Sequence, residues 1–305
     1  MKMTQKELCV TGIGLLSPFG VGLESLWKGY QDWCEKKVVG PQLIERPSQR
    51  FERMEVGRLS KAALCVCVCA EQAIESSKLD LYESYNKARI GVSIGTAYAS
   101  ANEVKMFSKK IVDEGPESVE PVAFPNTVSN AAAGYLGALY GFKGLNITFS
   151  AGLLSSSIAI SYACEAIEHN LIDIAIAGGV EELVNGQLDK HDLEGCFLMI
   201  IERRGDAAKR KANRFGYLSH RRSKNKNANI PRESVQITGG NRVKQFNQLS
   251  SFSERFHGSS TAMTYALGLA AGSSLEIQSA AWNDVNPNSL SKLCFAIHAN
   301  KKVTV

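Results

Sequence analysis

Residues 145–183 predict a strand, a helix and a second strand in succession, and this unit constrains the fold more than any other part of the chain. Residues 146–150 form a short run with β-branched and aromatic side chains, and small residues then lead into a helix over 155–169. A second apolar strand follows and ends at Gly178 and Gly179. Two strands joined by one crossover helix pair in parallel, so the chain is predicted to be an α/β protein.

Strand-like runs recur along the whole chain. Those of the first part predict a mostly parallel sheet, with strands at 8–13, 89–94, 145–150 and 172–177. Those after Glu182 predict a second sheet, with strands at 195–202, 214–219, 235–238, 275–281 and 293–298. Residues 261–271 are rich in small side chains and are expected to form the buried helix of this second sheet.

The order of four motifs resembles that of the β-ketoacyl synthases in the thiolase superfamily. Cys9 begins CVTGIGLLSPFG, which is similar to the family's first strand and turn, and Gly91 begins GVSIGT, which is similar to its second strand. Phe124 begins FPNTVSNAAAG and Tyr140 begins YGFKG, which resemble the loop and helix before the nucleophile strand; residues 145–183 supply the fourth match. The resemblance implies two pseudo-duplicated βαβαβ halves in αβαβα layers, at 1–183 and, shortened, at 184–305. Together they would form one compact unit with a truncated C-terminal half.

The nucleophile of that family is missing. Its members present a cysteine in the turn after the strand at 146–150, at a helix N-terminus where the helix dipole favours a thiolate. Local alignment on the dipeptide before the turn puts Gly152 at this position, whereas counting back from the end of the second strand puts Leu153 there. Neither side chain can form a thioester, so no catalytic residue is expected at this turn.

Other catalytic groups of the family are missing as well. Residues 235–240 lie where the resemblance places a first histidine and contain none, and Phe252 stands where a lysine is expected. His257 matches a second histidine, and no glycine-rich loop follows the strand at 292–299. Condensation needs a thiolate together with donors that stabilise the developing oxyanion. His257 is therefore expected to be a surface residue or a satisfied structural one.

A scaffold kept without its chemistry resembles the chain-length factor, the ketosynthase-β subunit of type II polyketide synthases. The resemblance implies a heterodimer with a catalytic ketosynthase-α and an acyl carrier protein that brings phosphopantetheine, with no cofactor of the chain's own. The subunit would shape the tunnel in which a polyketide grows. The short chain is similar to the compact Gram-negative type, which is associated with aryl polyenes or aromatic polyketides.

Two alternatives belong to other functional classes. One is an autonomous acyltransferase or condensing enzyme of thiolase fold that uses Ser155 with His257. The other is a degenerate synthase that binds the carrier protein only to regulate or scaffold an assembly. The first requires a positioned general base and a second hydrogen-bond donor near Ser155.

The resemblance also implies positions for the tunnel and the dimer interface. Chain length would be limited by a helix after the second strand and by the loop before the nucleophile strand, where the candidates are Asn102, Val104, Met106, Phe107, Ile111, Phe124, Asn126, Thr127 and Asn130. About half of them are expected to face the tunnel. The nucleophile strand would pair across the dimer axis through Asn146, Ile147, Thr148, Phe149 and Ser150.

Positive charge accumulates between Asp206 and Glu233, where no acidic residue occurs. This segment could attract an acidic carrier protein, with docking candidates Lys209, Arg210, Arg214, Arg221 and Arg222. A solvated basic loop is the alternative. The net charge of +5 does not demand a polyanionic partner, so no nucleic acid partner is expected.

Composition and cysteine spacing exclude several other classes. The 305 residues are 44% hydrophobic, enough for a large core, and no apolar run could span a bilayer. No signal peptide is recognised, so a cytoplasmic protein is expected. Cys65, Cys67 and Cys69 lie in a stretch that reads as a helix, without a CxxC motif or a nearby histidine. They are predicted to be buried apolar residues, and no metal site is expected.

Overall fold

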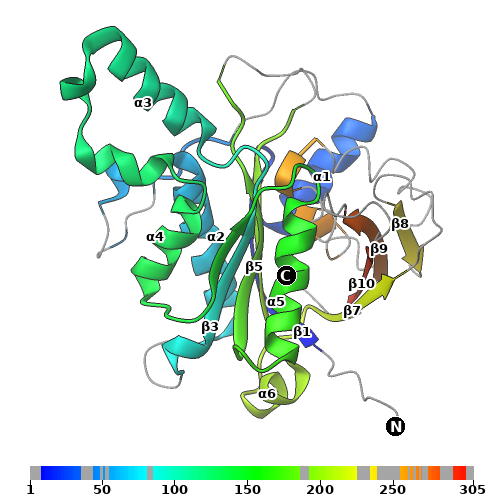
Figure 1. The fold of residues 1–305 in the computed structure, drawn as a ribbon. Helices are drawn as coiled ribbons and strands as arrows, with labels where there is room; N and C mark the ends of the chain where they lie inside the picture. The colour runs from blue at the N-terminus through cyan, green and yellow to red at the C-terminus, as the bar shows by residue number, and fades with distance from the viewer. Residues whose placement is uncertain are drawn as a thin grey trace.

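The computed structural model shows helices packed on both sides of a twisted sheet (Figure 1). It describes residues 8–35, 44–48, 51, 55–80, 85–185, 192–224, 234–238, 255–259, 262–263, 266–267, 269, 274–281 and 291–299. For strand residues after 218, the description covers the backbone only. These ranges do not include Phe252 or residues 239–240 and 300–302, where the family resemblance places catalytic or loop positions.

Ten strands form one hydrogen-bonded sheet in the order β4-β3-β5-β6-β1-β7-β10-β9-β8, with β2 beside β1. Their bounds are β1 Leu8–Ser17, β2 Gly20–Val21, β3 Ile90–Gly95, β4 Asn146–Phe149, β5 Ile174–Glu181, β6 Gly195–Arg203, β7 Gly216–Lys224, β8 Ser234–Thr238, β9 Ser274–Ala281 and β10 Ser291–Ala299. All nine strands predicted from the sequence are present, with ends shifted by a few residues. One shift matters for the site, because β5 continues beyond Gly178 and Gly179 to Glu181.

The four strands for which a mostly parallel sheet was expected, β1, β3, β4 and β5, run in one direction, but β6 lies antiparallel between β5 and β1. Among the described strands, only the neighbouring pairs β3–β4 and β3–β5 are parallel. The pairs β5–β6, β1–β6, β1–β7, β7–β10, β9–β10 and β8–β9 are all antiparallel. The crossover helix between β4 and β5 imposes the parallel direction locally, and the strands after β5 are not bound by it.

The expectation of a separate second sheet is wrong, because backbone hydrogen bonds join the later strands to the first ones in one sheet. β6, which the boundary after Leu183 assigned to the second half, lies between β5 and β1. Residues Leu8, Cys9 and Val10 of β1 then pair with β7 on their other side, which joins the later strands to the first ones. In Figure 1, α1 and α5 lie between β3 and β5 on one side and β8, β9 and β10 on the other, so sheet and helix layers still alternate.

Four helices cover the two faces of the first part of the sheet. α1 (Gly22–Cys34) and α5 (Ser155–Glu168) share one apolar cluster with alternate residues of β1, β5 and β6. α2 (Lys61–Ser77) and α4 (Ala131–Tyr140) share a second cluster with β3 and with the other residues of β5 and β6. Because side chains alternate along a strand, β5 and β6 contribute to both cores. Within 261–271, the described residues Ala262, Met263, Ala266, Leu267 and Leu269 are helical and buried, as predicted.

α2 is buried on nearly all sides because two glycines of β1 allow it to lie against the sheet. A Cβ atom on Gly14 would lie 1.8 Å from the carbonyl oxygen of Cys69, and one on Gly12 would lie 2.0 Å from that of Ala73. Cys65, Cys67 and Cys69 are all buried in this helix, so their prediction as buried apolar residues is confirmed. Burial raises the pKa of the Cys67 thiol to about 12, which keeps it neutral.

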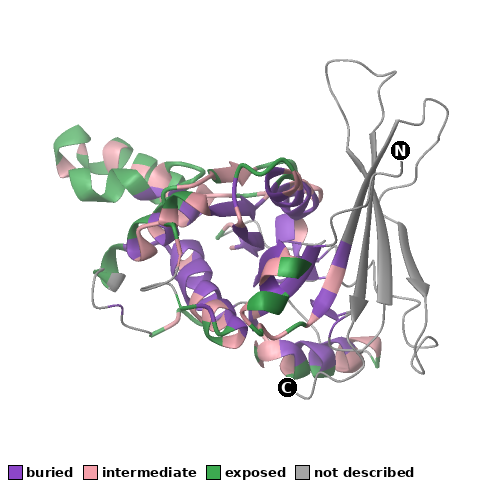
Figure 2. Cartoon of the chain, turned by 90° about the horizontal axis from the view of Figure 1, so that it is seen from below, coloured by how far each residue is buried: buried purple, intermediate pink, exposed green. Residues whose placement is uncertain are grey.

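A projecting arm follows β3. It consists of α3 (Ala101–Glu114) and the short 3-10 helices η3 (Pro116–Ser118) and η4 (Pro121–Thr127), which pack mainly against one another. Figure 2 shows buried residues concentrated where the sheet and its helices meet, and mostly exposed residues along this arm. Only Asn102 is buried on α3. An amphipathic helix held this far from the core leaves apolar side chains in solvent.

Replacing Gly14 with alanine should destabilise the protein by about 1–3 kcal/mol, because the added methyl group overlaps the backbone of α2 and forces the helix away from β1. Urea unfolding followed by circular dichroism would measure the loss. Gly205→Ala is the matched control, since a Cβ there meets nothing within 4 Å and Gly205 lies within a helix. Equal stability of the two variants would contradict the close approach of α2.

Candidate functional site

The candidate site lies where β3, β4 and β5 end. All three strands run in the same direction, so their carboxyl ends meet at one end of the sheet, a usual place for binding sites in α/β proteins. Three segments converge there: the turn at 151–154 before α5, the turn at 96–100 before α3, and η6 (His257–Ser259). The sequence resemblance placed the first and third of these at an active site, and the structure brings both to the same end of the sheet.

The turn before α5 offers no nucleophilic side chain. Gly152 has a left-handed backbone with φ +59° and is exposed, and nothing lies within 4 Å of where its Cβ would be. Leu153 follows it, half-buried, and α5 begins two residues later without a side-chain cap. Cys164, the nearest cysteine in sequence, is fully buried, and burial holds the pKa of its thiol far above the usual range. No thiolate can form at this turn.

Ser155 is occupied by the structure of the turn itself. Its hydroxyl donates to the carbonyl oxygen of Gly152 at 2.6 Å and accepts from the N–H of Ala151 at 2.9 Å. Its side chain is completely buried. Because both hydrogen-bonding roles of the hydroxyl are used and no substrate can reach it, Ser155 acts as a local brace of the turn.

His257 also has both of its ring nitrogens in use. Nε2 lies 2.9 Å from Oδ1 of Asp192, and Nδ1 lies 3.4 Å from the hydroxyl of Tyr98. The ring packs against the Tyr98 ring with centroids 5.0 Å apart. Both ring nitrogens of His257 therefore have hydrogen-bond partners, as expected for a satisfied histidine.

Glu181, which the sequence reading did not single out, is the central polar group of the site. It is buried at the end of β5, and its carboxylate accepts N–H bonds from Ala97 at 2.8 Å, Tyr98 at 3.1 Å and Gly258 at 2.7 Å. The Thr96 hydroxyl donates to Oε1 of Glu181 at 3.0 Å. A glutamate directly after an unbroken apolar strand was the available signal, since buried carboxylates need hydrogen-bond partners.

The tunnel candidates of the arm divide into exposed and structural residues. Val104, Met106, Phe124 and Asn130 are exposed, while Phe107, Ile111 and Thr127 are half-buried. Phe107 and Phe124 meet edge to face with centroids 6.1 Å apart, which braces α3 against η4. Asn102 and Asn126 are buried, so they do not present their side chains at the surface.

Asn102 and Asn126 have structural partners. The amide of Asn102 donates to Glu182 at 3.1 Å and to the Leu183 carbonyl at 2.8 Å, and its oxygen accepts from the N–H of Asn185 at 2.9 Å. Asn126 donates to the carbonyl of Arg58 at 2.6 Å. These contacts tie the arm to the body of the protein.

β4 is the edge strand of the described sheet. Asn146 and Ser150 are exposed, and Ile147, Thr148 and Phe149 are half-buried. Asn146 donates to the carbonyl of Ala133 in α4, whereas Phe149 packs against Tyr162 in α5 with ring centroids 5.5 Å apart. The predicted alternation between the two faces is therefore confirmed. The Thr148 hydroxyl is buried without a hydrogen-bond partner in the described part of the chain.

The first part of the basic segment, which the structure describes, lies at the opposite end of the sheet. α6 (Arg204–Lys209) follows β6 beside the first residue of β5, so the length of β5 separates it from Glu181, about 25 Å at the usual rise per residue (Figure 1). Arg210 pairs with buried Glu202 and donates to the Ser77 carbonyl, while Lys209 pairs with Asp206 at 2.8 Å. Arg214 is exposed, and the side chains of Arg221 and Arg222 lie outside the description. Lys209, Arg210 and Arg214 therefore lie away from the site.

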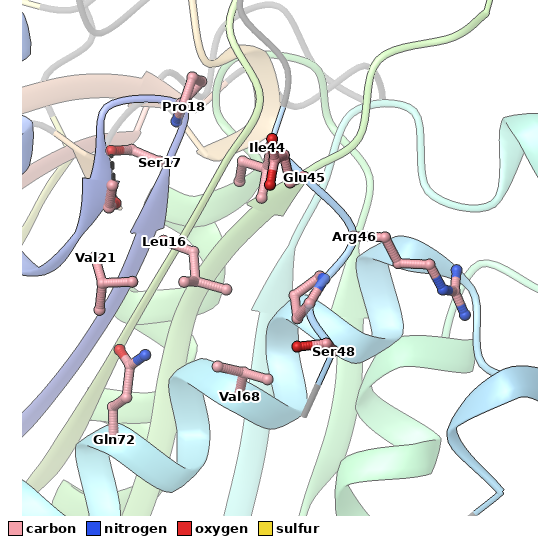
Figure 3. A pocket seen from close by; sticks show the side chains of 12 residues that line it. Leu16, Ser17, Pro18, Val21, Ile44, Glu45, Arg46, Ser48, Val68 and Gln72 are labelled. Carbon is pink, nitrogen blue, oxygen red and sulfur yellow. Dashed lines mark hydrogen bonds between the residues drawn. The ribbon is translucent and has the colours of Figure 1, made fainter. Parts of the chain in front are cut away.

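A cavity of about 650 Å³ lies on the α2 side of the sheet. Figure 3 shows it between the turn from β1 to β2, residues 44–48 and one side of α2, with Leu16, Val68 and Gln72 on its walls. Gln72 uses its side-chain oxygen to accept the N–H of Leu15.

Two further findings concern metals and membranes. Among the described residues, no group of three or more histidine, cysteine, aspartate or glutamate side chains could hold a metal ion. No described helix is both long enough and apolar enough to cross a bilayer.

The family assignment comes from the segment that builds this site. Residues 37–188, which contain α2, β3, α3, α4, β4, α5 and β5, match the model of the β-ketoacyl synthase N-terminal domain. These residues, just under half of the chain, are similar to the β-ketoacyl synthase N-terminal domain. Within that family domain, the strand-to-helix turn carries Gly152 and Leu153 and no cysteine.

The chain is similar to several synthases over about three fifths of its length. It is 29% identical over 195 residues to 3-oxoacyl-[acyl-carrier-protein] synthase 2 of Vibrio harveyi, which covers 59% of this chain and 46% of that one. The corresponding protein of Vibrio cholerae is 27% identical, with 59% and 47% covered. The chain thus spans about half the length of these relatives.

Solved structures with low sequence identity share the fold. One is an acyl-carrier protein of a type II polyketide synthase in complex with its ketosynthase, with a TM-score of 0.73, 16% identity and 96% and 99% of the two chains covered. The ishigamide ketosynthase/chain length factor gives 0.69, 12% identity and 96% and 99% coverage. The Xenorhabdus doucetiae ketosynthase in complex with its chain length factor gives 0.56, 15% identity and 73% and 63% coverage. The predicted thiolase-like α/β fold is therefore confirmed.

Glu181 should make stability depend on pH. Burial raises its pKa to about 7, against an ordinary value of 4.5, so between these values the folded protein binds more protons than the unfolded chain. The free energy of unfolding should therefore fall as pH rises from about 5 to 8, by on the order of 3 kcal/mol. Urea unfolding across this range would measure the trend.

Glu181→Gln is the matched variant. Its amide oxygen can accept from Ala97 and Gly258, and its NH2 group can donate to Thr96, as a protonated carboxyl would. Its stability should change less with pH over the same window. Parallel pH profiles for the two proteins would show that Glu181 does not titrate there.

Proposed function

We propose that this chain is a non-catalytic ketosynthase-β subunit, a chain-length factor that pairs with a cysteine-bearing ketosynthase. The observation that carries the proposal is the turn before α5, which lies at the site of this family domain without a thiol. The two groups that could replace a thiol are committed elsewhere, since the Ser155 hydroxyl braces the turn and both His257 nitrogens have partners. Acyl transfer through this chain alone would lack a nucleophile.

The surface of the arm supports a partner chain. Six of the exposed large apolar residues lie on or beside α3 and η4, namely Val104, Met106, Val112, Val122, Phe124 and Val128. A group of this kind on a projecting element is typical of a protein interface. The edge strand β4 gives a second contact, because its outer backbone groups have no neighbouring strand in the described sheet.

The solved neighbours support the same partners. One is described as a ketosynthase with its carrier protein, and two as ketosynthases with a chain length factor. We propose that the heterodimer works on acyl carrier protein during malonyl condensations of polyketide biosynthesis, and that the exposed arm residues help to close the tunnel. Lys209 and Arg210 are weak candidates for the carrier dock, because their charges are paired and they face away from the site.

The decisive experiment co-expresses the chain with a cysteine-bearing ketosynthase encoded beside it. The expected result is a one-to-one complex on size exclusion that extends malonyl units on the carrier protein only when both chains are present. Replacing the partner's nucleophilic cysteine by alanine should abolish the activity. Turnover by this chain alone would instead favour the autonomous acyltransferase, and a complex without any effect on products would favour a scaffold.

Met106→Glu should weaken the complex at least tenfold, because a charge would be buried in an apolar contact (about 1.4 kcal/mol per tenfold). Met106 is 59% exposed in the single chain, so the substitution should leave the folded monomer intact. Leu171→Glu is the matched control, at 63% exposure on the far side of α5 from the turn. Equal affinities of both variants for the ketosynthase would remove the arm from the interface.

A further inference from the structure

Two turns with left-handed backbones face each other across Glu181. Ala99, just before α3, has φ +49°, and His257, at the start of η6, has φ +43°. A residue with a Cβ atom in this conformation costs roughly 1–2 kcal/mol, so its surroundings must hold it there. The Glu181 carboxylate holds both turns.

Glu181 binds the two turns with one carboxylate. Its Oε2 accepts from the N–H of Ala97 in the first turn and from the N–H of Gly258 in the second. Its Oε1 lies within hydrogen-bond distance of the Tyr98 N–H and the Thr96 hydroxyl. The Thr96 hydroxyl in turn accepts the N–H of Ala99 at 3.0 Å, so Glu181 holds the strained residue Ala99 indirectly, through Thr96. Because a shared acceptor oxygen has a fixed position, moving one turn disturbs the bond to the other.

Direct packing adds a second link between the turns. The Tyr98 ring lies on the His257 ring, and a Cβ atom on Gly258 would lie 2.1 Å from the Ala97 nitrogen. The two backbones are therefore in close contact, with no room for independent movement.

The first turn is also the root of the arm. α3 packs mainly against η3 and η4, so its direction relative to the sheet is set at residues 96–102. Asn102 fixes the first helical turn to residues 182–185, directly after Glu181. The orientation of the exposed apolar residues beyond it depends on this short segment.

We propose that Glu181 is a positioning residue that couples the η6 turn to the α3 arm, so that partner binding on the arm and the conformation of the His257 turn are linked. The part concerning the partner rests on the proposed function, whereas the coupling within the chain does not. Linkage is reciprocal: a partner that orders the arm stabilises η6, and a change at η6 alters affinity for the partner. Binding of a partner to the arm would therefore change the conformation at the end of the sheet where the site lies.

The first test uses the isolated chain and hydrogen exchange measured by mass spectrometry. Gly258→Ala places a methyl group against Ala97 and Glu181, so η6 must shift. Peptides covering 96–104 should then exchange about tenfold faster, although the substitution lies more than 150 residues away in sequence. Gly205→Ala is the control, with nothing near its added methyl group. Faster exchange at 257–259 with no change at 96–104 would overturn the proposal.

Glu181 itself is tested by a pair of variants. Glu181→Ala removes every bond to both turns and should speed exchange in both segments together, whereas Glu181→Gln should retain most of the protection because it keeps an acceptor for Ala97 and Gly258. A merely local role would release only one segment. If Glu181→Ala does not fold, Thr96→Val, which removes the bond to Ala99, serves instead and should loosen 257–259 as well; an unchanged rate there would contradict the coupling.

The second test adds the ketosynthase partner. Binding should slow exchange at 96–104 and also at 257–259, and Gly258→Ala should weaken binding at least about fivefold. If the unaltered chain forms no complex, the proposed function fails while the first test still decides the coupling. If a complex forms and 257–259 is not protected, the link between partner and η6 is wrong.

Discussion

The central position of β1 is the constraint on which the other elements depend. Its first residues pair with β6 on one side and with β7 on the other, so one strand joins the two parts of the sheet. Gly12 and Gly14 let α2 approach the backbone of this strand. The irregularity between Val10 and Gly12 shifts the alternation, so that Leu8 and Val10 before it and Leu15 after it all reach the core under α1 and α5. Glu202, buried beside β1, is satisfied by Thr11 and Arg210 and fixes the start of the chain to the segment after β6. A polar group buried so deeply is stable only with such partners.

The site lies at the carboxyl end of the parallel strands of a ketosynthase-like fold, and its polar side chains make structural bonds. The hydroxyl of Ser155 closes the turn, the imidazole of His257 is held between Asp192 and Tyr98, and the carboxylate of Glu181 accepts backbone N–H groups. Each polar side chain contributes to the position of a loop. The fold depends on packing and backbone pairing, so it does not require any one side chain at the turn before α5.

Several parts of this picture could be predicted from the sequence. The strand-to-helix turn was recognisable because small residues between an apolar run and a helix leave few other conformations, and the absence of a cysteine at 150–155 needs no structure. The burial of Cys65, Cys67 and Cys69 followed from a helical stretch without polar spacing. The resemblance named positions on the helix at 102–111 and in the loop at 124–130 as tunnel candidates, but it did not predict that they form a projecting arm. Nor did it predict that Asn102 and Asn126 are buried and tie this arm to the body of the protein.

The sequence by itself determined the α/β class, the places of the strands and the missing nucleophile, since these follow from local hydrophobic period and residue identity. Only the tertiary structure decided the direction of strand pairing, the joining of all strands into one sheet and the meeting of Glu181 with Gly258, 77 residues apart along the chain. It also separated the basic segment around α6 from the site. The physical reason is that hydrogen-bond partners and burial depend on which distant segments come together, and local sequence patterns carry no information about that choice.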